Sequence, residues 1–129
     1  TETGTSLKKH GLKIIDTLLT SRTEVITNAA AYADADKRAA MDDVMLLLRG
    51  AIQARGKVLI KLNVPDTHLS DILAVLPSMG SPTITALADC EMSAVESVVP
   101  KKGVNTLIPT LKSAGARDIL EIPISKIVE

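Results

Sequence analysis

The chain has 129 residues, the size of one domain or of one small domain with part of another. Hydrophobic residues make up 46% of it, but Tyr32 is its only aromatic residue, so the core must be aliphatic and stacking on nucleic-acid bases is disfavoured. Because 15 basic residues balance 15 acidic ones, the charge offers no electrostatic footprint for nucleic acid or for a membrane surface.

Cys90 is the single cysteine, and His10 and His68 are the only histidines. One thiol can form neither an intrachain disulfide nor a cysteine-based zinc site, which fits a cytoplasmic protein without a metal centre in this chain. The apolar runs fall far short of the roughly 20 residues of a membrane helix, and the N-terminus lacks the pattern of a signal peptide. We therefore expect a soluble, cytoplasmic chain whose two histidines are surface residues.

A polar loop opens the chain and runs into a short helix that ends at Gly11. The stretch Thr3-Gly4-Thr5-Ser6 offers hydroxyls, backbone N–H groups and a helix N-terminus, a combination that suits a phosphate. The same residues also make an ordinary helix N-cap. Because the sequence starts inside this loop without a methionine, we expect the chain to be a fragment.

Two strands over residues 12–19 and 23–27 are predicted next, joined by a turn as a β-hairpin, because they are rich in Ile, Leu, Val and Thr. Two strands alone are marginally stable, so we interpret the N-terminal part as the end of a larger domain. The longest helix is predicted to run from Asp34 or Asp36 to Arg55 and to end at Gly56. Its wide apolar stripe favours a helix that connects two domains.

A regular order of elements follows. Alternating apolar residues predict a strand over 58–64, and apolar residues at helical spacing predict a helix over 69–76. The remaining predicted elements are strands over 83–87 and 92–99 around a turn at 89–91, a helix that opens at 100–103 and stops at Gly115, and a strand over 118–124. This order is that of a ferredoxin-like βαββαβ domain, an α/β (α+β) fold with both helices on one face of an antiparallel sheet. The predicted domains are 1–57 and 58–129.

The stretch 76–84, between the first of these helices and the next strand, is where we expect a ligand. Two prolines and Gly80 break the helix there, because proline cannot donate the backbone hydrogen bond. The hydroxyls of Ser78, Ser81 and Thr83 then need partners. An ordinary turn with self-capping serines explains the same composition, so the residue types alone leave both interpretations open.

Several separated motifs stand in residues 58–129: Ser81-Pro82-Thr83-Ile84, Leu87-Ala88-Asp89, Val98-Val99-Pro100-Lys101-Lys102, Val104-Asn105, the stretch 111–120, and Ile122-Pro123-Ile124-Ser125-Lys126-Ile127. In this order and spacing they closely resemble the C-terminal regulatory domain of long-form ATP phosphoribosyltransferase. Upstream, Thr3-Gly4-Thr5-Ser6-Leu7 with Gly11-Leu12 resembles the phosphoribosyl pyrophosphate loop of that family's catalytic region.

The resemblance implies the first step of histidine biosynthesis, in which N1 of the adenine of ATP attacks C1 of phosphoribosyl pyrophosphate and pyrophosphate leaves with the help of Mg²⁺. It also implies a cytoplasmic homo-hexamer that L-histidine inhibits. The remnant of the 5′-phosphate loop would be Glu2, Thr3, Gly4, Thr5 and Ser6. Because the strands and the second lobe that complete the cleft are not in this sequence, we expect the chain alone to be inactive. No metal ligand is identified in it.

The same resemblance implies an L-histidine site around the 76–84 stretch. Ser81 and Thr83 would supply two hydroxyls, and Met79 and Val98 would supply two apolar walls. Asn63 would form a polar end, and the backbone at Asp118 and Ile119, at the start of the last strand, would complete the site. Some members of the family have a carboxylate where this chain has Asn63, and a neutral amide loses the charge-assisted part of a hydrogen bond.

Two other functions compete with this one. A structural module of the same ferredoxin-like fold could serve oligomerisation without binding an effector. A complete small transferase is the other alternative, and it would form pyrophosphate from ATP and phosphoribosyl pyrophosphate.

Overall fold

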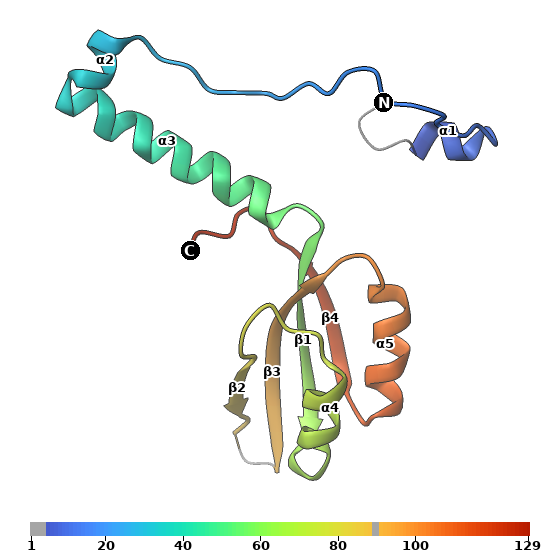
Figure 1. Ribbon diagram of the computed structural model, residues 1–129. Helices are drawn as coiled ribbons and strands as arrows, with labels where there is room; N and C mark the ends of the chain where they lie inside the picture. Colours follow the sequence, from blue (N-terminus) through green and yellow to red (C-terminus); the bar gives the residue numbers. More distant parts are fainter. Residues whose placement is uncertain (1–4, 89–90) are drawn as a thin grey trace.

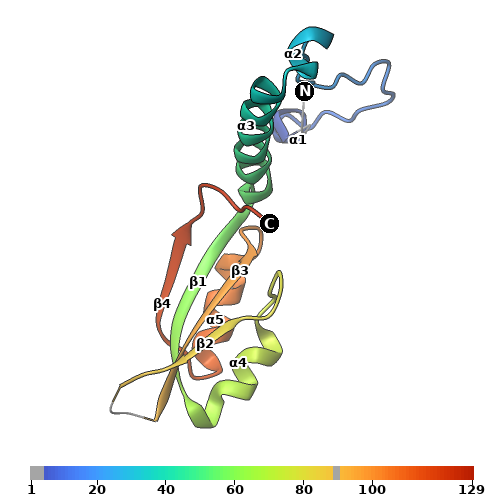
Figure 2. The ribbon, with the colours of Figure 1, turned by 90° about the vertical axis from the view of Figure 1, so that its left-hand side faces the viewer.

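The computed structural model describes residues 5–88 and 91–129. Its centre is a four-stranded antiparallel sheet with strand order β2-β3-β1-β4, and the helices α4 and α5 cover one face of it (Figures 1 and 2). A long helix, α3, leads away from the sheet toward the N-terminal part of the chain (Figure 1). The order of strands and helices in residues 57–123 is βαββαβ, so the predicted ferredoxin-like α+β fold is confirmed.

The two central strands lie where the alternating pattern predicts the middle of a sheet. β1 (Lys57–Pro65) pairs with β3 (Met92–Pro100) along its whole length, from Lys57 opposite Pro100 to Pro65 opposite Met92. β2 (Thr83–Ala86) adds to the outer edge of β3, and β4 (Arg117–Pro123) adds to the outer edge of β1. The predicted turn between β2 and β3 falls partly on residues 89 and 90, which lie outside the described residues.

The core lies between the sheet and the two helices. Every second side chain of β1 is buried, whereas the alternate side chains on the other face are half-buried. The short 3-10 helix Asp66–His68 leads into α4 (Leu69–Val75), and α5 (Val104–Ser113) packs beside it. The fully enclosed core side chains are all aliphatic, as the composition requires: Val58, Ile60, Leu62, Val64, Ile72, Val95, Val99, Val104 and Leu111.

The long helix α3 (Ala35–Ala54) begins and ends where its sequence signals stand. Asp34 is its N-cap, and the Asp34 carboxylate accepts hydrogen bonds from the backbone N–H groups of Asp36 and Lys37, both at 3.1 Å. The hydrogen bond from the Lys37 backbone lowers the pKa of Asp34 from its ordinary value. Gly56, just after the helix, has φ +71°, a conformation that glycine adopts without strain.

The C-terminal segment returns from β4 to the long helix. The backbone N–H of Ile127 donates a hydrogen bond of 2.9 Å to the carbonyl oxygen of Gly50 in α3. A Cβ atom at Gly50 would lie 3.0 Å from the carbonyl oxygen of Ile127 and from Cγ2 of Val128, so the close approach needs a residue without a side chain. The end of the chain therefore ties α3 to the sheet domain.

The predicted β-hairpin over residues 12–27 is wrong. After α1 (Thr5–Lys9), residues 12–28 form neither helix nor strand, and they run as an extended segment to α2 (Ala29–Ala33) (Figure 1). Their apolar side chains face solvent, with Ile15 97% and Leu18 95% exposed. A hairpin without a third strand or a covering helix buries too little apolar surface to offset the loss of chain entropy.

Candidate functional site

A cavity of about 250 Å³ lies at the edge of the sheet, where the loop after α4 meets β3. The loop is held there by a hydrogen bond of 3.1 Å from the Met79 backbone N–H to the Val98 carbonyl oxygen. The walls are Leu59, Met79, Gly80, Ser81, Thr83, Glu96, Ser97 and Val98. A smaller cavity of about 150 Å³ adjoins it and shares Met79 and Val98. The predicted break of the helix at residues 76–84 thus forms one side of a concave site.

Four of the residues named for the effector site line this cavity together: Met79, Ser81, Thr83 and Val98. Thr83 opens β2 and lies directly opposite Glu96 of β3. Within residues 5–88 and 91–129, the hydroxyls of Ser81 and Thr83 form no hydrogen bond with another protein group, so both are available to a ligand. The apolar side chains of Met79 and Val98 stand beside them.

Asn63 and Asp118 come together elsewhere on the sheet. The Asn63 side-chain amide donates a hydrogen bond of 3.0 Å to the Asp118 carboxylate, across the pairing of β1 with β4. A register shift between Lys61 and Asn63 bends this pairing, and Asp118 has φ +49°, in the left-handed region. Neither residue lines the cavity beside Thr83. Ile119 packs against the hydrophobic core.

The structure adds a charged pair that the motif-based prediction missed. The Lys61 ammonium lies 2.7 Å from Oε1 of Glu96, and both side chains are partly exposed on the face of the sheet that carries no helix. Glu96 also lines the cavity. The alternation of β1 places Lys61 on this face, but only the register of β1 with β3 puts Glu96 between Lys61 and Thr83.

The predicted remnant of the phosphate loop lies apart from the cavity. Glu2, Thr3 and Gly4 lie outside the described residues. Thr5 and Ser6 begin α1, which lies away from the sheet in both views (Figures 1 and 2). Gly11 follows that helix with φ +68°, so the predicted end of the short helix is confirmed.

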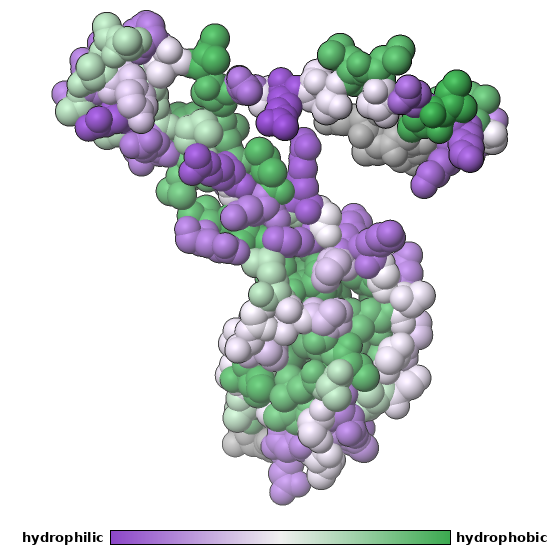
Figure 3. Space-filling view, in the orientation of Figure 1, coloured by the Kyte–Doolittle hydropathy of each residue, from purple (hydrophilic) through white to green (hydrophobic). Residues whose placement is uncertain are grey.

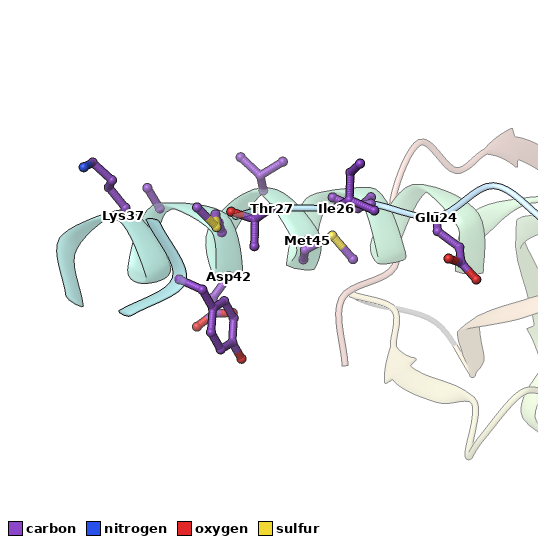
Figure 4. Close-up of a pocket in the computed structure, with 11 residues that line it drawn as sticks. Glu24, Ile26, Thr27, Lys37, Asp42 and Met45 are labelled. Atoms are coloured by element: carbon purple, nitrogen blue, oxygen red, sulfur yellow. The ribbon is translucent and has the colours of Figure 1, made fainter. Parts of the chain in front are cut away.

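A second cavity, about 800 Å³, lies between the extended segment and the first turns of α3 (Figure 4). Most of the side chains that line it are apolar, and three are charged: Glu24, Lys37 and Asp42. The other lining residues are Val25, Ile26, Thr27, Tyr32, Ala40, Met41, Val44 and Met45. Figure 3 shows hydrophobic residues exposed along this part of the chain. One wall is a segment without secondary structure, so the shape of this cavity depends on how residues 24–27 are held.

The described part of the chain holds no group of three or more His, Cys, Asp or Glu side chains that could bind a metal ion. In the same residues, no helix is long and apolar enough to cross a membrane.

The fold and the cavity define the chain as a ferredoxin-like domain with a small ligand-sized site at its sheet edge, preceded by a long helix. Residues 54–126 match the family described as "HisG, C-terminal domain", and residues 1–50 match the family described as "ATP phosphoribosyltransferase". The chain belongs to the HisG C-terminal domain family. The resemblance drawn from the sequence motifs is thereby confirmed.

Individual relatives agree with this assignment. The chain is 46% identical over 129 residues to an ATP phosphoribosyltransferase of Chlorobium chlorochromatii, a match that covers 100% of this chain and 44% of the relative. It is 47% identical over 128 residues to an ATP phosphoribosyltransferase of Solibacter usitatus, covering 99% of this chain and 44% of the relative. The chain thus spans less than half the length of the curated relatives it matches.

Proposed function

We propose that the chain is the part of an ATP phosphoribosyltransferase that binds L-histidine and lets it inhibit the enzyme. The observation that carries the proposal is the cavity at the sheet edge, because Met79, Ser81, Thr83 and Val98 meet there in a chain of this family. The hydroxyls provide hydrogen bonds to the polar atoms of an amino acid, and the apolar pair provides a wall for an imidazole ring. The proposed site also includes three residues that do not line this cavity: Asn63, Asp118 and Ile119.

Membership of this family supports a proposal for the reaction of the parent enzyme. The longer protein would transfer the phosphoribosyl group from phosphoribosyl pyrophosphate to ATP, the first step of histidine biosynthesis, as a cytoplasmic homo-hexamer. Mg²⁺ would supply positive charge to the pyrophosphate leaving group. In this chain, Glu2 to Ser6 would be the remnant of the phosphate loop. The chain alone is expected to be inactive, because transfer depends on charges positioned around the whole substrate.

Inhibition requires that L-histidine prefer one arrangement of the parent enzyme. A ligand shifts a conformational equilibrium only by the difference between its affinities for the two states. The loop before β2 is suited to carry such a difference, because a single backbone hydrogen bond, from Met79 to Val98, attaches its middle to the sheet. We propose that L-histidine in the cavity holds this loop against β3.

Calorimetric titration of the 129-residue chain with L-histidine tests the proposal. We expect saturable binding, and we expect Thr83→Val to weaken it roughly three- to tenfold, because valine keeps the shape and removes one hydrogen bond. Thr85→Val is the matched control, since Thr85 lies on the same strand and does not line the cavity. No heat up to millimolar L-histidine from a chain with an intact circular dichroism spectrum would contradict the proposal.

The uncovered face of the sheet supports a second candidate, an oligomerisation module without an effector. Leu120 and Ile122 of β4 are exposed on the sheet, and apolar side chains on a strand favour contact with another protein surface. Sedimentation in the presence and absence of L-histidine separates the two functions: stable oligomers together with no ligand binding would favour assembly. Formation of pyrophosphate from ATP and phosphoribosyl pyrophosphate would instead establish a complete small transferase.

A further inference from the structure

Among the described residues that line the 250 Å³ cavity, Glu96 is the one charged side chain. It stands on β3, which is paired on both sides, with β1 and with β2. Its backbone position is therefore held by two neighbouring strands, and a rigid element positions a binding group better than a loop does. The Glu96 side chain is 37% exposed, so solvent and ligands can reach it.

The neighbours of Glu96 define what it can bind. Thr83 lies directly opposite on β2, and residues opposite each other in an antiparallel pair have Cβ atoms roughly 5 Å apart. The Thr83 hydroxyl and the Glu96 carboxylate can thus contact the same group of a small ligand. An ionised carboxylate only accepts hydrogen bonds, so the matching group is a positively charged donor.

We propose that Glu96 is a specificity-determining residue of the effector site and that its carboxylate binds the α-ammonium group of the amino acid. This inference rests on the proposed function and deepens it. Asn63, the polar end named from the resemblance, is neutral and lies outside this cavity. Glu96 supplies the negative charge that Asn63 lacks, beside the two hydroxyls.

Lys61 is the internal competitor for this carboxylate. Its ammonium occupies one side of Glu96 at 2.7 Å, and it does not line the cavity. A carboxylate has two oxygens and can accept several hydrogen bonds, so a second cation can bind on the cavity side. Because both side chains are partly exposed, the ion pair itself contributes little to stability, and either partner can be replaced without unfolding the domain.

The experiment compares L-histidine with 3-(imidazol-4-yl)propanoate, which lacks only the α-ammonium group, by calorimetry on the 129-residue chain. Glu96→Gln should weaken L-histidine binding roughly ten- to hundredfold, the range of a charge-assisted hydrogen bond. The same variant should bind the propanoate as the unchanged chain does. Glu121→Gln, a carboxylate-to-amide change at an exposed position of β4, is the matched control and should bind L-histidine normally.

Lys61→Gln separates a ligand-binding role from a structural one. If Glu96 binds the ligand, removal of its competitor leaves L-histidine binding unchanged or tighter. Equal weakening by Lys61→Gln and Glu96→Gln would show that the ion pair matters only as a structural unit, and would overturn the inference. Binding of L-histidine that Glu96→Gln does not alter would also overturn it while leaving the proposed function intact, whereas absence of binding by the unchanged chain would overturn both.

Discussion

At the scale of single residues, the chain depends on a few backbone positions that only glycine suits. Gly115, which stops α5, has φ +100°. A Cβ atom there would also lie 3.2 to 3.3 Å from atoms of the His68 side chain. The two elements that cover the sheet thus meet at this point, because His68 leads into α4 and Gly115 follows α5. The helix-stop signal predicted at Gly115 is confirmed, while its contact with His68 was not foreseen.

Gly115→Ala should lower the free energy of unfolding by about 1–2 kcal/mol, the cost of a left-handed backbone for a residue with a Cβ atom. Crowding against His68 adds to this cost. Gly80→Ala is the control, because no atom lies within 4 Å of a Cβ built at Gly80 and its φ is not in the left-handed range. Urea unfolding followed by circular dichroism measures both variants, and equal stabilities would contradict the expectation.

At the scale of elements, hydrophobic periodicity determines which faces are buried. The strand β1 alternates between buried and half-buried side chains as its sequence predicts, and Leu62 is 0% exposed. The helix α3 differs from β1, because several of the large side chains on its wide apolar stripe face solvent. Leu47, for example, is 51% exposed. The wide stripe predicted a helix that connects two domains, and the residues that the structure describes cover only part of the stripe.

Leu62→Ala should therefore lower the free energy of unfolding by about 2–5 kcal/mol, because it leaves a cavity in a closed aliphatic core. Leu47→Ala, the same change on the exposed stripe of α3, should alter stability by no more than about 0.5 kcal/mol. Thermal and urea unfolding of the two variants measure the difference. A large loss of stability in Leu47→Ala would mean that α3 has a partner in solution, such as a second copy of the chain.

At the scale of the whole molecule, the chain divides into a packed C-terminal domain and an N-terminal part with little packing of its own. Residues 12–28 pair with no strand in the part of the chain that the structure describes, and their apolar side chains are exposed (Figure 1). In relatives more than twice as long, further residues are available to pair with such a segment. We propose that the division into residues 1–57 and 58–129 reflects two parts of a longer protein.

Limited trypsin digestion should cut first after Lys13 and Arg22, because proteases need an extended, accessible backbone. Arg49, within α3, and Lys61, within β1, are the internal controls and should be cut much more slowly, since their backbone groups are hydrogen-bonded in a helix and a sheet. Mass spectrometry over a time course identifies the products. Cleavage at all four positions at similar rates would contradict this division of the molecule.

The sequence alone determined the long helix α3 and the elements of the C-terminal domain, because each depends on a local period, a cap or a stop signal: the alternation in β1, the Asp34 cap and the glycines after α3 and α5. It also indicated the family, through motifs that keep their order and spacing. It erred at residues 12–27, because strand propensity does not supply the partner that a strand needs.

Only the tertiary structure decided how the site residues are grouped. The register of three strands brings Thr83 opposite Glu96 and Glu96 opposite Lys61, and it separates Asn63 and Asp118 from the cavity. Register depends on pairing between residues far apart in the chain, where a shift of one position turns every side chain to the other face. For that reason the motifs could suggest residues for the proposed site, but the position of Glu96 beside Thr83 could be found only in the folded sheet.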